Sequence, residues 1–376
     1  MRSLDKFAAK KLAELEDRHL RRVMVETVRE GIWVERNGRR ILSFSCNDYL
    51  NLTRHPAVVE SATRALHQYG VGSGASRLVT GNHPLFADLE GRLARLKGTE
   101  SACVFGSGYL ANTGIIPVLI GAGDLVLIDE LAHSCMWAGA QLSKGKIVSF
   151  LHNDVDHARE SLMRHRRDHC RTLIATDRVF SMDGDLAPLD GLAELAEQFD
   201  AWLMTDDAHG IGVLDQAKTD MKVPLQMGTL SKAIGSYGGY LCASGPVIEL
   251  IRNRARTLIY STGLPPSSVA AAIAAIDIIR REPDYAAQPV RKARAFTRRV
   301  GLPEAVSPIV PIVIGTETAA LAASRLLEDE GFLVVAIRPP TVPKGTARLR
   351  LTFTALHPDD EIDRLADIIR KRILER

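Results

Sequence analysis

The sequence contains little of what marks several classes of protein. Its 376 residues include five cysteines, an odd number, and no two of them form a Cys-x-x-Cys pair. Scattered cysteines of this kind argue against a disulfide framework and against a zinc site, and they are typical of proteins from a reducing cytosol. We therefore predict a cytoplasmic protein without a metal site.

Long apolar runs and a large excess of one charge are also missing. The most apolar helical pattern, residues 269–279, is too short and too rich in alanine to span a bilayer. The first 22 residues are charged and amphipathic and lack the apolar core of a signal peptide. Because the net charge is only +3, we predict no nucleic acid partner and no membrane association, although an anionic substrate is compatible with this charge.

The middle of the chain alternates short apolar strands with helical patterns. Its composition, with 46% hydrophobic and 25% charged residues, is that of an ordinary globular protein. Alternation of this kind predicts an α/β fold with a mostly parallel sheet that is covered by helices on both faces. The expected strands are 101–105, 125–128, 146–150, 172–176, 202–206 and 240–243.

The pattern changes toward both ends of the chain. Residues 4–29 have the periodicity of a helix, and Asn37-Gly38 between two apolar runs predicts a β-hairpin. Beyond residue 282 we expect strands at 309–314, 332–336 and 348–352 and helices at 317–330 and 359–374. The predicted units are an N-terminal helical arm and hairpin (1–45), a large domain (46–281) and a small C-terminal α+β domain (282–376).

Two segments of the large domain indicate a particular chemistry. Asp206 and His209 end an apolar strand, and Lys232 lies in a loop between small residues. A lysine amine can form a Schiff base with a carbonyl cofactor, and a carboxylate can keep a pyridine nitrogen protonated. Ligands of parallel sheets bind at the carboxyl ends of the strands, where these residues are expected to lie. The pattern therefore predicts a site for pyridoxal 5′-phosphate (PLP).

Glycines and hydroxyl groups near these segments could hold the cofactor phosphate. Gly108 and Tyr109 follow a predicted strand and open a helix, whose N-terminal amides favour a phosphate dianion. Thr229 precedes Lys232 by three residues, and Thr262 precedes another helix. A plain strand–helix turn and an ordinary helix cap are the alternatives. A second glycine-rich stretch, 70–76, follows no strand, so we expect it in a substrate or dimer-interface loop.

Four motifs, at residues 181–185, 206–210, 228–232 and 345–350, together resemble those of the α-oxoamine synthases. These are PLP enzymes of the aspartate aminotransferase fold, fold type I. The resemblance extends from about Arg39 to the C-terminus and implies a seven-stranded, mostly parallel sheet. Segments 236–240, 260–266 and 338–348 are most similar to the members that join L-alanine to a pimeloyl thioester. The carrier of the acyl group, coenzyme A or acyl carrier protein, stays open.

The resemblance also implies a role for each site residue. Lys232 would bind the cofactor covalently and later move the α-proton, and Asp206 would pair with the pyridine nitrogen. His133 would stack on the ring, while Ser181 and His209 would contact its phenolic oxygen. The phosphate ligands would be Gly108, Tyr109, Thr229 and, from the neighbouring subunit of a homodimer, Thr262. The substrate-binding residues would be Arg21, Asn47 and Arg348, with Arg348 preferred over Arg350 for the carboxylate.

Two departures from the family pattern leave questions about the acyl donor. Arg178 stands where the family usually has a small residue, and it would either touch the donor or point to solvent. The segment between residues 210 and 228 is short. A synthase that joins glycine to acetyl-CoA or succinyl-CoA is the first alternative. A catalytically inactive PLP-fold subunit is the second, and the presence of Lys232, Asp206 and His209 together argues against it.

Overall fold

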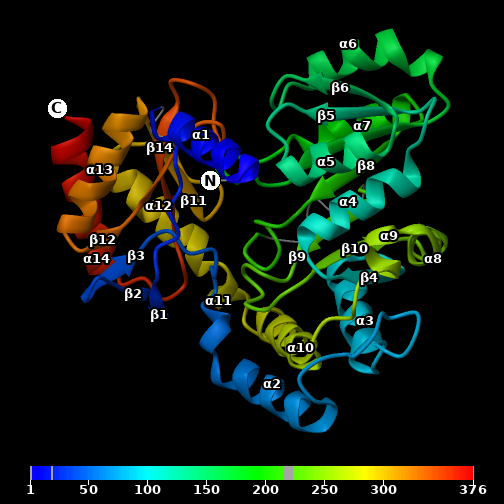
Figure 1. Cartoon of the computed structure of the whole chain (residues 1–376), viewed down its shortest axis with the longest axis horizontal. Helices are drawn as coiled ribbons and strands as arrows, with labels where there is room; N and C mark the ends of the chain where they lie inside the picture. The colour runs from blue at the N-terminus through cyan, green and yellow to red at the C-terminus, as the bar shows by residue number, and fades with distance from the viewer. Residues whose placement is uncertain (1, 18–19, 215–222, 376) are drawn as a thin grey trace.

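The computed structural model describes residues 2–17, 20–214 and 223–375 (Figure 1). Its largest sheet has seven strands in the order β4-β10-β9-β8-β7-β5-β6, and only β10 runs antiparallel to its neighbours. The strands are β4 (Ser101–Phe105), β5 (Leu125–Asp129), β6 (Lys146–Phe150), β7 (Thr172–Asp177), β8 (Trp202–Asp206), β9 (Leu225–Thr229) and β10 (Gly239–Ala243). The predicted fold class and all six expected strands are confirmed.

Strand β9 is the one strand of this sheet that we did not predict. Its sequence, Leu-Gln-Met-Gly-Thr, carries a glutamine and a glycine, both unusual in the centre of a sheet. The structure explains the glycine, because a side chain at Gly228 would collide with the phenol ring of Tyr240 on β10. Strand β9 matters for the site because it leads directly into the loop that carries Lys232.

Helices cover both faces of the large sheet, as the apolar strands predict. Helices α4 (Gly108–Leu119), α5 (Ser134–Leu142), α8 (Gly245–Arg254) and α9 (Arg256–Ile259) pack on one face. The opposite face is covered by α2 (Pro56–Tyr69), α3 (Leu85–Lys97), α6 (Val155–His165), α7 (Leu189–Gln198) and α10 (Pro266–Arg281). Successive strand residues alternate between these cores, as a pleated strand requires. Val104 and Cys103 are an example.

The C-terminal part is built on two small sheets. Strands β11 (Ile309–Gly315), β14 (Ala347–Thr352) and β13 (Val335–Ile337) form one of them. In the other, β1 (Val28–Glu30), β2 (Trp33–Arg36) and β3 (Arg39–Ser43) are joined by β12 (Phe332–Leu333). The helices are α11 (Pro283–Ala286), α12 (Gln288–Val300), α13 (Glu317–Asp329) and α14 (Asp359–Ile369). The strand predicted at 332–336 is therefore two strands, which belong to different sheets.

The predicted helix over residues 4–29 is too long. Helix α1 covers Ser3–Asp17, none of its residues is buried, and Val28 already belongs to β1. Val23, Val25, Thr27 and Val28 are β-branched and lose rotamer freedom in a helix, so the later part of the predicted span does not favour a helix. Among the described residues, no helix is both long and apolar enough to cross a bilayer.

The hairpin at Asn37-Gly38 is confirmed, and it is part of the C-terminal unit. Both turn residues have positive φ angles, 50° and 70°, as the tight turn between twisted strands requires. Strand β3 pairs in parallel with β12, and Leu42 and Phe44 lie in the same hydrophobic core as Phe332 and other C-terminal residues. Residues 28–44 therefore contribute to packing at the other end of the chain. The domain limits at 45 and 281 stay a prediction.

A buried histidine in this unit should make stability depend on pH. His357 stacks on Phe44 at 4.0 Å, accepts the Thr354 amide and donates to the Ser43 carbonyl. Burial lowers its pKa to about 4, whereas a histidine in the unfolded chain has a pKa of about 6.5. Below about pH 6.5 the unfolded chain therefore binds a proton that the folded protein does not, and the folded state loses stability. We expect unfolding free energy to fall by about 2 kcal/mol from pH 7 to 5 through this group. Urea unfolding of His357→Asn should show a smaller pH-dependent loss; an equal loss would contradict the assignment.

Candidate active site

The predicted lysine and histidine lie in direct contact. Lys232 Nζ is 2.8 Å from His209 Nε2, and the hydroxyl of Tyr49 is 2.7 Å from the other ring nitrogen, Nδ1. Burial, together with the positive charge of Lys232, lowers the pKa of His209 well below its usual value. Burial also raises the pKa of Tyr49 to about 12. At neutral pH these groups are therefore a neutral imidazole and a neutral phenol, each able to donate and to accept a proton.

The carboxylate predicted to face the cofactor nitrogen is held by two donors. Asp206 is buried at the end of β8, where its Oδ2 accepts Asn112 Nδ2 at 2.8 Å and its Oδ1 accepts the Ala208 amide at 2.9 Å. The two hydrogen bonds fix the orientation of the carboxylate. The remaining lone pairs stay available to a third donor, as the proposed role of Asp206 requires.

The surroundings of Lys232 lower the pKa of its amine and so favour the neutral form. Burial lowers its pKa, and Arg350 acts in the same direction, whereas Asp206 and Asp177 oppose the shift. An amine must lose its proton before it can attack a carbonyl carbon, so this shift favours covalent attachment of the cofactor. Asp206 and Arg350 are therefore close enough to Lys232 to act on its charge.

His133 lies at the same edge of the sheet, after β5. Its backbone amide donates to Asp177 Oδ2 at 2.7 Å, and its Nδ1 is 2.7 Å from the thiol of Cys135. Asp177 pairs with Asp206 in the register of β7 and β8. Burial and the charge of Asp206 raise the pKa of Asp177 well above the usual value, while burial lowers the pKa of His133. The structure thus places His133 beside Asp206 and Lys232, whose charges act on its ring.

The predicted phosphate ligands fall into two groups. Gly108 begins α4, and a side chain here would come within 3.2 Å of Met227 and 3.7 Å of the Thr229 hydroxyl. The Thr229 hydroxyl donates to the Gly238 carbonyl at 2.8 Å. Tyr109 is 55% exposed. Thr262 is also exposed and forms an isolated bridge with Ser76.

The two arginines of β14 have different partners. Arg348 forms an ion pair with Asp183 and donates to the Met182 carbonyl. Arg350 donates to the Ser181 carbonyl and, at 3.3 Å, to the side-chain oxygen of Asn47. Both arginines are buried, so neither lies on a solvated strand face. Ser181 and Asn47, predicted near the cofactor and the substrate, therefore meet at Arg350.

Arg178 does not point to solvent. It is buried and donates to Asp207 Oδ2 at 3.2 Å, and Lys97 Nζ contacts the same oxygen at 2.8 Å. The two cations compensate the charge of the buried Asp207 carboxylate, which follows Asp206 directly in the chain. Of the two alternatives for Arg178, orientation to solvent is wrong, because Asp207 binds its guanidinium group inside the protein; contact with the acyl donor stays a prediction. The predicted short segment 210–228 lies partly outside the described residues, since 215–222 are not described.

A cavity of about 610 Å³ opens beside His133 and Ser181. Trp137, Arg22 and the segment 340–343 complete much of its lining. Arg22 also donates to the hydroxyl of Thr341 at 3.0 Å, which ties the N-terminal segment to this wall. Arg21, the residue predicted to bind substrate, is exposed and pairs with Glu16 at 2.8 Å. Its role stays a prediction.

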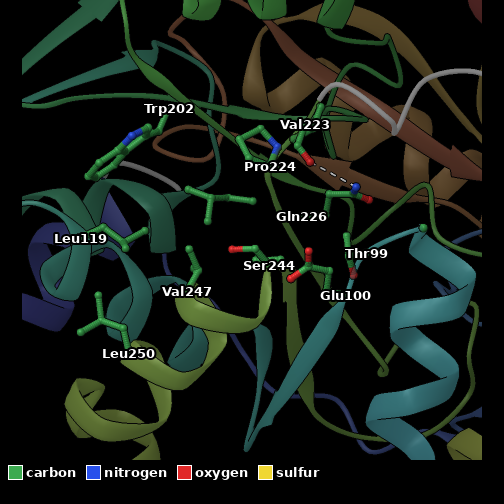
Figure 2. A pocket seen from close by; sticks show the side chains of 13 residues that line it. Thr99, Glu100, Leu119, Trp202, Val223, Pro224, Gln226, Ser244, Val247 and Leu250 are labelled. Carbon is green, nitrogen blue, oxygen red and sulfur yellow. Dashed lines mark hydrogen bonds between the residues drawn. The ribbon is translucent and has the colours of Figure 1, made fainter.

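A second cavity, of about 560 Å³, lies away from these residues (Figure 2). Trp202, Val223 and Glu100 line it, and they lie at or before the amino ends of parallel strands. Since the predicted site residues follow the carboxyl ends of the strands, this cavity belongs to the opposite edge of the sheet. It contains none of the predicted site residues.

Sequence reasoning missed Tyr49, Asn112 and Arg22. Tyr49 lies two residues after Asn47, and Asn112 ends the glycine-rich stretch that follows β4, so both stood within motifs already singled out. Their partners, His209 and Asp206, are 160 and 94 residues away along the chain. The local sequence around each residue does not indicate a partner so far away along the chain.

Comparison with known proteins identifies the family. The family of class I and II aminotransferases matches residues 39–369. The 8-amino-7-oxononanoate synthase of Granulibacter bethesdensis is 60% identical over 98% of both chains. That of Methylocella silvestris is 63% identical over 89% of this chain and 97% of its own. The chain is an α-oxoamine synthase of the class I and II aminotransferase family.

A solved structure of an α-oxoamine synthase agrees with this assignment. Serine palmitoyltransferase from S. paucimobilis, with bound PLP and myriocin, has a TM-score of 0.90, 27% identity and coverage of 98% of both chains. PLP is therefore the cofactor of this α-oxoamine synthase, and the chain is a PLP-dependent acyltransferase. Its own residues fit PLP, because Lys232 supplies the amine, Asp206 a buried carboxylate and the start of α4 a helix N-terminus without a side chain at Gly108.

Proposed function

We propose that this α-oxoamine synthase condenses L-alanine with a pimeloyl thioester to give 8-amino-7-oxononanoate, carbon dioxide and a free thiol, a reaction of biotin biosynthesis. The observation that carries the proposal is the contact between Lys232 and His209 at the sheet edge that also holds Asp206. Relatives named 8-amino-7-oxononanoate synthase, alike over almost the whole chain, support the choice of substrates. The thiol carrier is coenzyme A or acyl carrier protein.

Each residue of this group has a distinct task in the reaction. PLP, when bound, supplies an electron sink for the negative charge that develops on the α-carbon of alanine. The amine of Lys232 binds the cofactor and then accepts and returns the α-proton. His209 and Tyr49 form a hydrogen-bonded chain that orients this amine and can relay its proton. Asp206 holds the proton on the cofactor nitrogen, with its own position fixed by Asn112.

Arg350 is the better candidate for the carboxylate of alanine, in place of Arg348. The charge of Arg348 is already neutralised by Asp183. Arg350 has two neutral oxygen partners and acts electrostatically on Lys232 and His209. A guanidinium group without a bound carboxylate can bind a substrate carboxylate with two parallel hydrogen bonds. We therefore replace our preference for Arg348 with Arg350.

The ranking of the two arginines can be measured. We expect Arg350→Ala to raise KM for alanine by about 10- to 100-fold, the loss of a charged hydrogen bond in a buried site. Arg348→Ala removes a contact to Asp183 and should act more on thermal stability than on KM. Steady-state kinetics and thermal unfolding of both variants decide between them. A larger rise of KM for Arg348→Ala would restore the original assignment.

The acyl donor fits the cavity beside His133. Its volume of about 610 Å³ accommodates an extended acyl chain, and Arg22 in its wall offers a cation to a carboxylate or a phosphate. Arg22 lies on a segment that reaches the cavity through Thr341, so the donor would contact both ends of the chain. The cavity opens next to Ser181 and thus next to the reacting groups.

The surface around Thr262 fits an interface between two copies of the chain. Thr262 forms an isolated bridge with Ser76, and the amide of Gly263 donates to the Ala75 carbonyl at 3.0 Å. Apolar side chains nearby are strongly exposed, namely Val71 (79%), Leu78 (60%), Val79 (73%) and Tyr260 (76%). Exposed apolar surface of this extent marks an interface between proteins. We propose that the paired segments around Ser76 and Thr262 pack on a second copy of the chain. Thr262 would then contact the cofactor phosphate bound by that second copy.

Product formation tests the proposed reaction. We expect the PLP-loaded protein to yield 8-amino-7-oxononanoate, detected by mass, from L-alanine with pimeloyl-CoA or with pimeloyl carrier protein. Glycine paired with acetyl-CoA and glycine paired with succinyl-CoA serve as matched alternatives. Activity with a glycine pair alone would keep the family and the cofactor but reject the proposed substrates.

A further inference from the structure

A histidine outside the reacting group lies between two carboxylates. His152 follows β6, and its Nδ1 is 3.1 Å from Asp129 Oδ1 while its Nε2 is 2.8 Å from Asp185 Oδ2. A carboxylate only accepts hydrogen bonds, so both ring nitrogens must donate, which only the imidazolium form can do. Phe180 packs edge-on against the same ring at 4.3 Å. The two contacts to carboxylates therefore favour the imidazolium form of His152, and Asn153 Nδ2 lies 3.3 Å from the same Nε2.

The two carboxylates belong to the loops that carry predicted cofactor contacts. Asp129 is the last residue of β5 and precedes His133 by four positions, and Asp185 follows Ser181 by four positions. Asp129 also accepts the amides of Leu131 and Asn153 at 2.8 and 2.9 Å. The Asp129 carboxylate thus fixes the start of the His133 loop.

Asn153 makes a second connection between the same two carboxylates. Its side-chain nitrogen donates to Asp185 Oδ2 at 2.9 Å and to the Leu186 carbonyl at 3.2 Å, while its backbone amide binds Asp129. The backbone of Asn153 has a positive φ of 57°, which turns both of its donors toward this cluster. His152 and Asn153 together therefore join the two loops, in addition to the bond from the His133 amide to Asp177.

We propose that His152 is a positioning residue, whose imidazolium holds the His133 loop against the Ser181 turn and so sets the spacing of two groups on the PLP ring. This inference rests on the roles proposed for His133 and Ser181, not on the identity of the amino acid or thioester. Burial opposes the charge, but hydrogen bonds to Asp129 and Asp185 raise the pKa of His152 to about 10. Glu130 is a further charged group at this position, and its carboxylate accepts the His152 backbone amide at 3.1 Å.

The test compares His152→Gln with the wild type in three measurements. We expect the dissociation constant of PLP to rise about tenfold, as for the loss of a charge-assisted hydrogen bond. Hydrogen exchange should accelerate at residues 130–133 and 181–185. In NMR spectra of the wild type, both ring nitrogens of His152 should stay protonated at pH 8. None of these readouts depends on the substrates, so failure here differs from failure of the proposed reaction.

Matched variants separate positioning from general stability. His157→Gln changes a histidine five residues away that accepts the Leu151 amide, and it should leave PLP affinity unchanged. The double variant His152→Gln/Asp185→Asn replaces the ion pair with a neutral amide pair and should recover part of the lost affinity. A lower melting temperature with unchanged PLP affinity and unchanged exchange would overturn the proposal, as would a neutral His152 ring at pH 8.

Discussion

Lys232→Ala is expected to abolish turnover, with kcat lower by about 10⁴-fold or more, while the protein still folds and still binds PLP. The change removes both the covalent attachment of the cofactor and the group that moves the α-proton, and proton transfer alone contributes about 10²–10⁴-fold. Stability should not suffer. Burial lowers the pKa of Lys232, which means that the folded protein holds its charged form at a cost in free energy. Removing the amine removes that cost.

Three measurements check this expectation. Single-turnover and steady-state assays with alanine and pimeloyl-CoA give the loss in rate, and mass spectrometry after borohydride reduction shows whether the cofactor is bound covalently. Thermal unfolding should give a melting temperature equal to or above that of the wild type. Lys146→Ala, at the exposed start of β6, is the matched control and should leave all three unchanged. More than about 1% residual kcat would show that another base moves the proton.

The strands could be predicted because buried parallel strands are short, apolar and separated by helices. Strand β9 departs from that pattern for a local reason. Gly228 leaves the space that the ring of Tyr240 occupies. Because Tyr240 belongs to the neighbouring strand β10, the sequence of β9 alone does not reveal why a glycine is needed there. The prediction of a single strand at 332–336 is wrong for a similar reason, because this apolar run contributes to two strands, β12 and β13, of different sheets. Pairing partners that are distant in sequence decide such cases.

The same distinction between local pattern and distant partners applies to the residues of the candidate site. Lys232, Asp206 and His209 could be predicted because each follows a strand and the carboxyl ends of parallel strands meet at one edge. Tyr49 and Asn112 form hydrogen bonds with His209 and Asp206. Both belong to other segments of the chain, and only the tertiary structure brings them to these partners.

The arginines show a further limit of sequence reasoning. Residue spacing on β14 indicates that Arg348 and Arg350 share one side of the strand, which places both near the site. Their partners differ, because Asp183 pairs with Arg348 and not with Arg350. The charge of Arg178 is likewise neutralised by Asp207, a partner that the sequence does not reveal.

Asp206→Asn should lower kcat by about 10²–10³-fold and weaken PLP binding, without loss of the fold. A preorganised charge that faces a developing charge contributes about this much to a rate. The carboxylate accepts hydrogen bonds from Asn112 and from the Ala208 amide. An asparagine at this position turns an NH₂ group toward one of these donors, so the variant loses both a charge and an acceptor. Equilibrium dialysis of PLP and steady-state kinetics measure the two effects.

The reciprocal variant Asn112→Asp/Asp206→Asn separates charge from hydrogen bonding. The swap reverses the direction of the 2.8 Å bond between the two side chains but keeps a bond and a negative charge in the pair. If the function of Asp206 is to place a carboxylate against the pyridine nitrogen, PLP affinity should recover in part while kcat stays low. Recovery of kcat to within about tenfold of the wild type would show that a negative charge anywhere in the pair suffices. Asn112→Ala alone leaves the carboxylate and its bond to Ala208 in place, and it should therefore cost less than Asp206→Asn in both measurements.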